Sequence, residues 1–167
     1  MEENPLFDRN VVLFIRRHNK FNDIGICIQT MCRHNHYNYL NVIINQFIKG
    51  KWVNKISINT INDVAQEELD RACDSGYLKI MGILLSFLKW NTMLSEYFYN
   101  DLDKCINYAC KGKNLDVIKF LEFWCHRYLS GYTITWSEKI NIVCQGGNPY
   151  IINWVTSRII SQRQRKH

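Results

Sequence analysis

The sequence predicts an all-α fold: a short α-solenoid of about four degenerate helix pairs, with a capping helix at its N-terminal end. Cysteines recur at 32, 73, 110 and 144, in steps of 73 − 32 = 41, 110 − 73 = 37 and 144 − 110 = 34 residues. A turn rich in glycine or asparagine and an apolar, helix-like stretch follow each of them. A repeat of this length with a helix–turn–helix in each unit is typical of α-solenoids.

The N-terminal residues predict a capping helix and the first helix pair. Residues 5–19 begin with Pro5 and continue with apolar residues at helical spacing, so we expect a helix that covers the open end of the array. The first pair is predicted at 23–33 and 38–49, with a loop or short hairpin over 51–59. Its first helix has a single apolar stripe, formed by Ile24, Cys27, Ile28, Met31 and Cys32.

The second helix pair gives the strongest indication of stacking. Residues 60–63 form a capping-box pattern that opens its first helix. The partner helix, predicted at 78–89, is apolar on almost every side and contains Ile80, Met81, Ile83, Leu84, Leu85, Phe87 and Leu88. Because such a helix must be covered from several directions, we expect the pairs to lie against one another.

The remaining chain predicts two further pairs. After a partly helical connector at 90–100, we expect helices at 101–111 and 115–128. A second capping box at 135–138 introduces a helix over 138–145, and Pro149 suits the first turn of a last helix over 150–160. Residues 1–160 are predicted to form one domain, followed by a frayed basic tail at 161–167.

Composition narrows the class of protein. The 167 residues are 47% hydrophobic and 22% charged with a net charge of +6, as in a folded globular protein. The longest uncharged apolar run, 80–88, is far shorter than the ~20 residues of a membrane-spanning helix. Arg16 and Arg17 follow the first apolar run, which is the wrong order for a secretory signal. Seven cysteines, an odd number of which four recur at one place in the repeat, predict reduced, buried thiols in an intracellular protein.

One cluster has the donor types of a zinc site. Cys27, Cys32, His34 and His36 supply four candidate ligands within a short stretch. Cys27 and Cys32 match Cys105 and Cys110 of a later repeat that has no neighbouring histidine, so core packing is the preferred interpretation. We therefore expect no metal and no cofactor. Since no phosphate loop, paired carboxylates or nucleophile elbow occurs, we also expect no enzymatic activity.

Aromatic residues in the connecting segments are the candidate partner-binding residues, because Trp and Tyr are enriched in interface hot spots and solenoid connectors edge the concave surface. They are Trp52, Trp90, Tyr97, Tyr99, Tyr132 and Trp136. The alternative is that these side chains fold back onto the core. Apolar groups of the N-terminal helix leave a homodimer open as well. The cations are dispersed except at 158–166 and around 49–55, which favours a solvated surface over a nucleic-acid site.

The repeat core resembles that of ankyrin repeats. The matching residues are Ala72, Cys73, Gly76, Leu78, Ile80, Leu84 and Leu85, and then Ala109, Cys110, Leu115, Val117 and Leu121. The Thr-Pro-Leu-His opening of ankyrin repeats is absent from all four units, the steps exceed 33 residues, and Lys113 holds one expected glycine position.

Such divergent repeats in a short chain rich in Ile, Asn, Lys and Cys resemble, over residues 20–160, multigene family 300 of African swine fever virus, which is related to its multigene family 360. The resemblance implies an early protein of the host cytoplasm that binds host signalling proteins and dampens interferon and NF-κB signalling. We therefore expect a non-enzymatic interaction scaffold; the alternative is a basic nucleic-acid-binding accessory protein.

Overall fold

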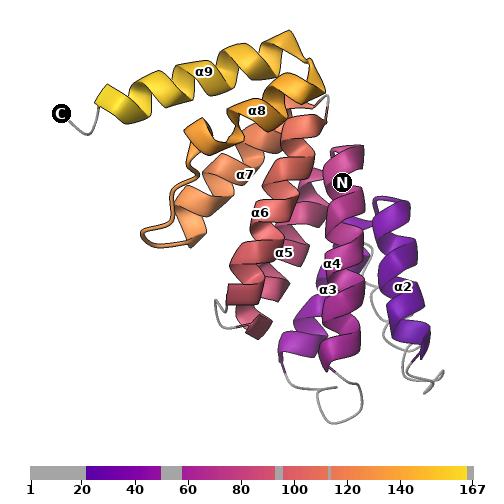
Figure 1. Ribbon diagram of the computed structural model, residues 1–167. Helices are drawn as coiled ribbons and strands as arrows, with labels where there is room; N and C mark the ends of the chain where they lie inside the picture. The colour runs from indigo at the N-terminus through magenta and orange to yellow at the C-terminus, as the bar shows by residue number, and fades with distance from the viewer. Residues whose placement is uncertain (1–21, 50–57, 93–95, 113, 165–167) are drawn as a thin grey trace. The chain divides into compact units, whose positions relative to one another are not determined.

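The computed structural model describes residues 22–49, 58–92, 96–112 and 114–164, and these form eight α-helices and no strand (Figure 1). The all-α prediction is confirmed. The helices are α2 (Asn22–Arg33), α3 (Tyr37–Ile48), α4 (Ile58–Ser75), α5 (Leu78–Thr92), α6 (Glu96–Lys111), α7 (Leu115–Tyr128), α8 (Trp136–Gly146) and α9 (Pro149–Gln164). The predicted capping helix at 5–19 lies outside the described residues.

The four helix pairs share one local geometry around the recurring cysteine. In every pair the second helix begins five residues after that cysteine, as at Cys73 and Leu78 (78 − 73 = 5). Three residues after the cysteine the backbone enters the left-handed region wherever it is described: φ is 54° at Asn35, 72° at Gly76 and 68° at Gly147. Glycine and asparagine tolerate this conformation best. The predicted helix–turn–helix repeat is therefore confirmed at the level of each pair.

Several helix ends differ from the predicted ones. The helix α4 begins at Ile58, α5 continues to Thr92 and α6 begins at Glu96, so most of the connector predicted at 90–100 is helical. At the C-terminus, α9 continues to Gln164 into the stretch predicted to fray. The Gln162 side chain donates a hydrogen bond to the carbonyl of Ile134 at 2.8 Å, which gives that last turn a tertiary contact.

Asparagine side chains cap the starts of two helices, α7 and α9. Asn114 Oδ1 accepts a hydrogen bond from the backbone N–H of Asp116 at 2.9 Å, and Asn148 Oδ1 accepts one from that of Tyr150 at 3.0 Å. Pro149 holds the first position of α9, as predicted. Thr135, in contrast, makes no side-chain cap, so the capping box predicted there is wrong. Instead, Trp136, the first residue of α8, is buried and holds this end of the helix.

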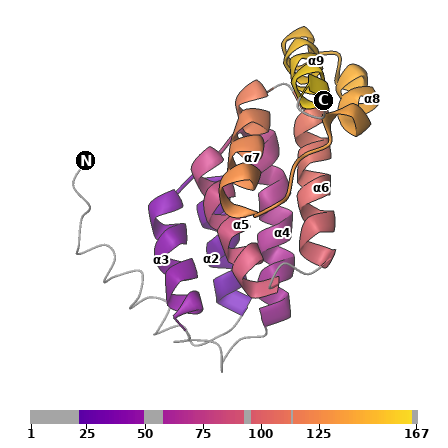
Figure 2. The ribbon, with the colours of Figure 1, turned by 90° about the vertical axis from the view of Figure 1, so that its left-hand side faces the viewer.

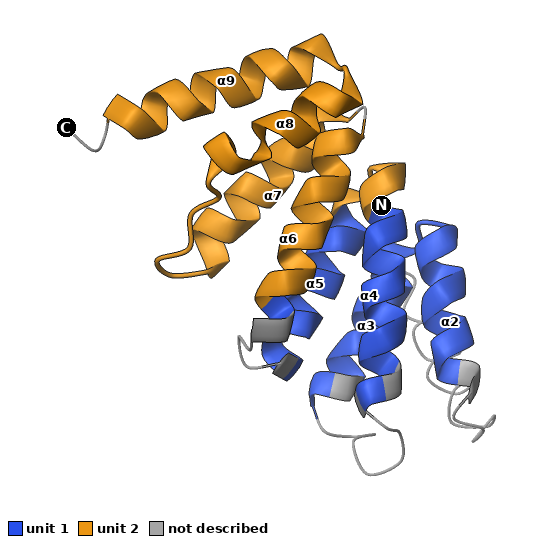
Figure 3. Cartoon of the chain, in the orientation of Figure 1, with its two compact units in different colours: residues 1–72, 79–98 blue, residues 73–78, 99–167 orange. Residues whose placement is uncertain are grey.

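The described chain divides into two compact units (Figure 3). Unit 1 comprises residues 1–72 and 79–98, and unit 2 comprises residues 73–78 and 99–167. In unit 1 the core is centred on α5, as predicted, since Ile80, Met81, Leu84, Leu85, Phe87 and Leu88 are all buried. Neither α5 nor any other helix in the described ranges is long and apolar enough to span a membrane.

In unit 1 the first helices of consecutive pairs, α2 and α4, lie close together (Figures 1 and 2). A Cβ at Gly25 would be 3.5 Å from a methyl group of Val64. Further along, Arg33 Nε is 4.0 Å from a carboxylate oxygen of Glu68, which Arg71 also contacts at 2.7 Å.

Unit 2 repeats this arrangement with α6 and α8. The Lys139 ammonium donates a hydrogen bond to the carboxylate of Asp103. At the other end, a Cβ at Gly146 would be 2.9 Å from the carbonyl oxygen of Cys110 and 3.0 Å from that of Lys111. Within each unit, consecutive pairs are therefore neighbours; a continuous solenoid over the whole chain stays a prediction.

Buried charges occupy an equivalent position in both units. Glu68 and Lys139 are 0% and 8% exposed, and each lies five residues before its recurring cysteine. The other two repeats have Cys27 and Cys105 there. Each of these two side chains lies near an oppositely charged group from the preceding first helix, which offsets part of the cost of burying it.

Candidate functional site

The predicted partner-binding residue Trp136 is buried, with 1% of its surface exposed. Its indole N–H donates a hydrogen bond to Glu122 of α7 at 3.0 Å, and its ring packs edge-on against Trp154 of α9 at 5.2 Å. Arg158 also contacts the Glu122 carboxylate, at 2.8 Å. The prediction of an exposed Trp136 is therefore corrected: this side chain folds back onto the core, where it joins α7, α8 and α9.

The other predicted aromatics fall into three groups. Tyr99 and Tyr132 are half-buried and stack on one another at 5.5 Å, and burial raises the pKa of Tyr132 to about 12, with Cys125, Asp103 and Tyr99 adding to the rise. Trp90 is 44% exposed at the end of α5. Trp52 and the side chain of Tyr97 lie outside what the structure describes.

The four candidate zinc donors do not come together. Cys32 is buried, whereas the imidazoles of His34 and His36 are exposed in the α2–α3 turn with their centroids 5.9 Å apart. The described residues contain no group of three His, Cys, Asp or Glu side chains that could hold a metal ion. Burial raises the pKa of the Cys32 thiol to about 12, and the neighbouring Glu68 adds to the rise.

Most of the recurring cysteines are buried, as predicted, but Cys144 is exposed. The buried side of α8 is formed by Trp136, Lys139 and Val143, which follow one another at helical spacing. Cys144 is the next residue after Val143 and falls on the outer side of the helix. The prediction that all four recurring cysteines pack into the core is thus wrong for this one.

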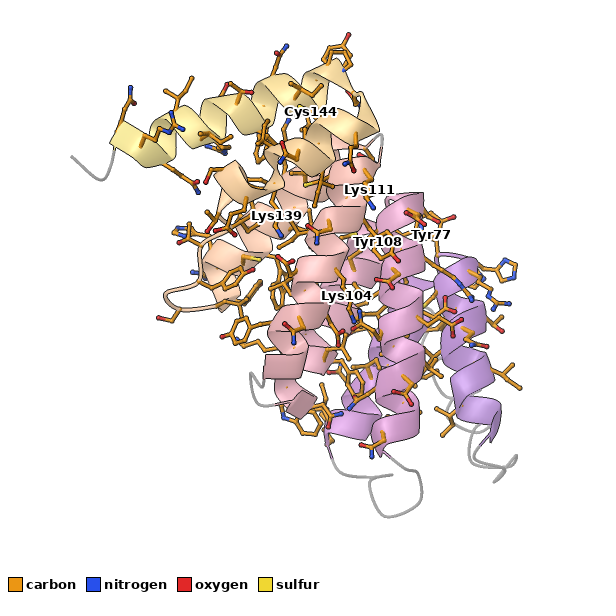
Figure 4. All side chains as sticks on the ribbon, in the orientation of Figure 1. Tyr77, Lys104, Tyr108, Lys111, Lys139 and Cys144 are labelled. Carbon is orange, nitrogen blue, oxygen red and sulfur yellow. The ribbon has the colours of Figure 1, made fainter. Side chains whose placement is uncertain are left out.

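A row of exposed side chains along α6 is the best candidate for a functional surface. Lys104, Tyr108 and Lys111 are spaced at i, i+4 and i+7 and lie opposite the buried residues of α6 (Figure 4). Tyr108 is 47% exposed. Lys104 pairs with Asp101 at 3.2 Å, and no ion pair among the described residues includes Lys111. We call these three residues the α6 row.

On another side of α6, Asp103 forms a polar contact with α8. Asp103 accepts hydrogen bonds from Lys139 and, at 3.1 Å, from Asn107. Burial raises the pKa of the nearby Cys110 thiol to about 11, because desolvation outweighs the opposing effect of Lys139. The α6 row presents an aromatic ring between two ammonium groups.

The same three repeat positions are solvent-facing in every first helix. The counterparts of the α6 row, six and two residues before the recurring cysteine and one after it, are each exposed or half-buried. They are Ile26, Thr30 and Arg33 in α2, Glu67, Arg71 and Asp74 in α4, and Glu138, Ile142 and Gln145 in α8. This row differs between repeats: it includes an apolar residue in α2, only charged residues in α4 and an aromatic ring in α6, on helix pairs that share one local geometry. Variation on a constant framework is suited to recognition of different partner groups.

The α6 row lies within a helix, outside the connecting segments whose aromatics were the predicted partner-binding residues. The spacing of Lys104, Tyr108 and Lys111, opposite the stripe of Leu102 and Ile106, could have shown it. Comparison with protein-family models, with curated proteins and with solved structures finds no match to this chain. The fold defines only a class, that of all-helical chains built from repeated helix pairs.

Proposed function

We propose that the chain is a non-enzymatic scaffold that binds a partner protein through the exposed rows of its first helices, with the α6 row as the main contact. The observation that carries the proposal is Tyr108, which is exposed on α6 between Lys104 and Lys111; among the residues that the structure describes, Lys111 is in no ion pair. An exposed tyrosine supplies a large contact area at low conformational cost, and such residues dominate interface energies.

The resemblance to the viral multigene families extends this proposal to a biological setting. On that basis the partner is a host signalling protein of the cytoplasm, and binding dampens interferon and NF-κB signalling. A repeat framework with varied exposed rows, which serves binding to extended surfaces, supports this setting. The alternative, a nucleic-acid-binding accessory protein, would use the same lysines on phosphates.

A capture experiment with a matched control tests the proposal. The chain is expressed in human cells carrying an interferon-promoter reporter, and bound proteins are identified. We expect Lys104→Glu/Tyr108→Ala/Lys111→Glu to lose the captured protein and the reporter effect. The control Lys49→Glu/Tyr150→Ala/Arg163→Glu changes charge and aromatic content equally at exposed sites elsewhere and should retain both.

Two outcomes would contradict the proposal. Equal loss in both triple variants would mean that net charge matters and the α6 row does not. Capture that disappears after nuclease treatment, with an affinity that falls steeply with salt, would instead support the nucleic-acid alternative.

A further inference from the structure

The outer side of α7 carries an exposed phenylalanine between two cations. Phe123 is 62% exposed, and Lys119 and Arg127, four residues before and after it, are exposed as well. Residues four apart lie on the same side of a helix, about one turn from each other. His126 is also exposed on this side. We call Lys119, Phe123 and Arg127 the α7 patch.

The cations of the α7 patch are not neutralised within the described residues. The ion pairs there use Arg33, Arg71, Lys104, Lys139 and Arg158, and none of them includes Lys119 or Arg127. Two acids lie three residues from Lys119 along the helix, and one of them, Glu122, is held by Trp136 and Arg158. Asp116 lies in the first turn of α7, where its carboxylate suits the positive end of the helix dipole.

The helix that presents the α7 patch is firmly fixed. Its inner side is buried through Val117, Ile118, Leu121, Trp124 and Cys125. Asn114 caps its N-terminus, and the ring of the exposed Tyr128 packs on Trp124 at 5.4 Å. A surface that is already ordered loses little conformational entropy on binding.

We propose that the α7 patch docks an acidic helical segment of a partner protein. An apolar side chain of that segment packs on Phe123, and two carboxylates pair with Lys119 and Arg127. These two cations are eight residues apart, which corresponds to about 12 Å along a helix axis. The partner helix therefore needs an acidic, an apolar and an acidic residue at i, i+4 and i+8, antiparallel or parallel to α7.

A polyanion such as single-stranded nucleic acid fits this patch less well. Such ligands are bound along a positively charged groove with several aromatic stacking platforms. Here a single phenylalanine stands between two cations on a convex helix surface. Its apolar ring gains from an apolar counterpart, whereas hydrated phosphates would leave it exposed. The observations thus favour a protein segment.

Chemical-shift mapping on the isotope-labelled full chain tests the proposal. The probe is a short alanine-based helical peptide with Glu, Leu and Glu at i, i+4 and i+8. We expect shifts of the backbone amides of residues 119–127. A peptide of the same composition with the glutamates moved by two positions, away from the leucine face, should leave these amides unchanged.

Reciprocal charge reversal separates recognition from damage to the fold. Lys119→Glu/Arg127→Glu should weaken binding of the acidic peptide by about tenfold or more, since like charges then face each other. The same variant should bind the matching Lys-Leu-Lys peptide, which a misfolded chain would not do. Phe123→Ala should weaken both complexes.

No shift at 119–127, or equal shifts with the displaced-glutamate peptide, would overturn the proposal. Tighter binding of a single-stranded oligonucleotide at the same amides would assign the patch to nucleic acid instead. The α6 row is left intact in these experiments. Loss of this inference therefore leaves the proposed function standing, and loss of the α6 capture leaves this inference standing.

Discussion

Gly146 provides the sharpest test of the contact between consecutive helix pairs in unit 2. A Cβ at this position would lie 2.9 Å from the carbonyl oxygen of Cys110, 3.0 Å from that of Lys111 and 3.2 Å from the Lys111 Cα. All three are backbone atoms, so no flexible side chain can move aside. Gly146→Ala must therefore separate the C-terminal ends of α6 and α8.

The expected cost of Gly146→Ala is about 1–3 kcal/mol, the usual range for overpacking a close-packed contact. For a chain of this size that corresponds to a fall in Tm of about 2–4 °C per kcal/mol. The same substitution at Gly25 of α2 meets only a methyl group of Val64 at an ordinary 3.5 Å. Gly25→Ala should instead stabilise the chain by about 0.5–1 kcal/mol, because alanine is the better helix residue.

Urea unfolding of both variants and of the parent is monitored by circular dichroism and by tryptophan fluorescence. A loss of stability in Gly146→Ala together with a gain in Gly25→Ala would show that the close approach of α6 requires a glycine at 146. A midpoint for Gly146→Ala that is equal to or higher than that of the parent would refute this contact.

Three further predictions concern a buried cysteine, a buried glutamate, and the difference in reactivity between exposed and buried thiols. Cys73→Ser should cost about 1–3 kcal/mol in urea unfolding, because it buries a hydroxyl at a site that is 4% exposed; an unchanged midpoint would mean that Cys73 is open to solvent. Burial, opposed by Arg71 and Arg33, raises the pKa of Glu68. The contribution of Glu68 to the free energy of unfolding is therefore complete below the pKa of about 4.3 that the carboxyl has in the unfolded chain. It is lost as pH rises through the pKa of the folded state. Glu68→Gln, which cannot ionise, should gain stability relative to the parent between pH 4 and pH 7, and a constant difference would contradict the raised pKa. In thiol modification at pH 8, Cys144 should react fast and Cys144→Ser should remove that phase. The thiols of Cys32, Cys110 and Cys125, with pKa values raised by burial to about 12, 11 and 12, should react only on unfolding.

The helix pairs could be predicted from sequence because their cause is local. The positive φ at Gly76 and the apolar surface of α5 follow from residue type and spacing alone. The fate of Trp136 could not be predicted in the same way. Its burial depends on Glu122, 14 residues earlier, and on Trp154, 18 residues later (154 − 136 = 18), and a single sequence does not reveal which pairs meet.

The candidate surfaces could not be predicted from the sequence for a related reason. Sequence patterns show which side of a helix is apolar, but whether Lys111 or Lys119 has an acidic partner depends on which acids other helices bring near, and among the described residues neither is in an ion pair. The same holds for the buried Lys139. Its amine looks like an ordinary surface lysine until α6 places Asp103 beside it.

Lysine footprinting of the chain with its captured partner tests the proposed role of the α6 row most directly. Acetylation rates are measured for free and bound protein by mass spectrometry, with the exposed Lys49 as an internal reference. The proposal predicts that Lys104 and Lys111 become protected while Lys49 reacts as before. Unchanged reactivity of Lys104 and Lys111 in the complex would contradict it.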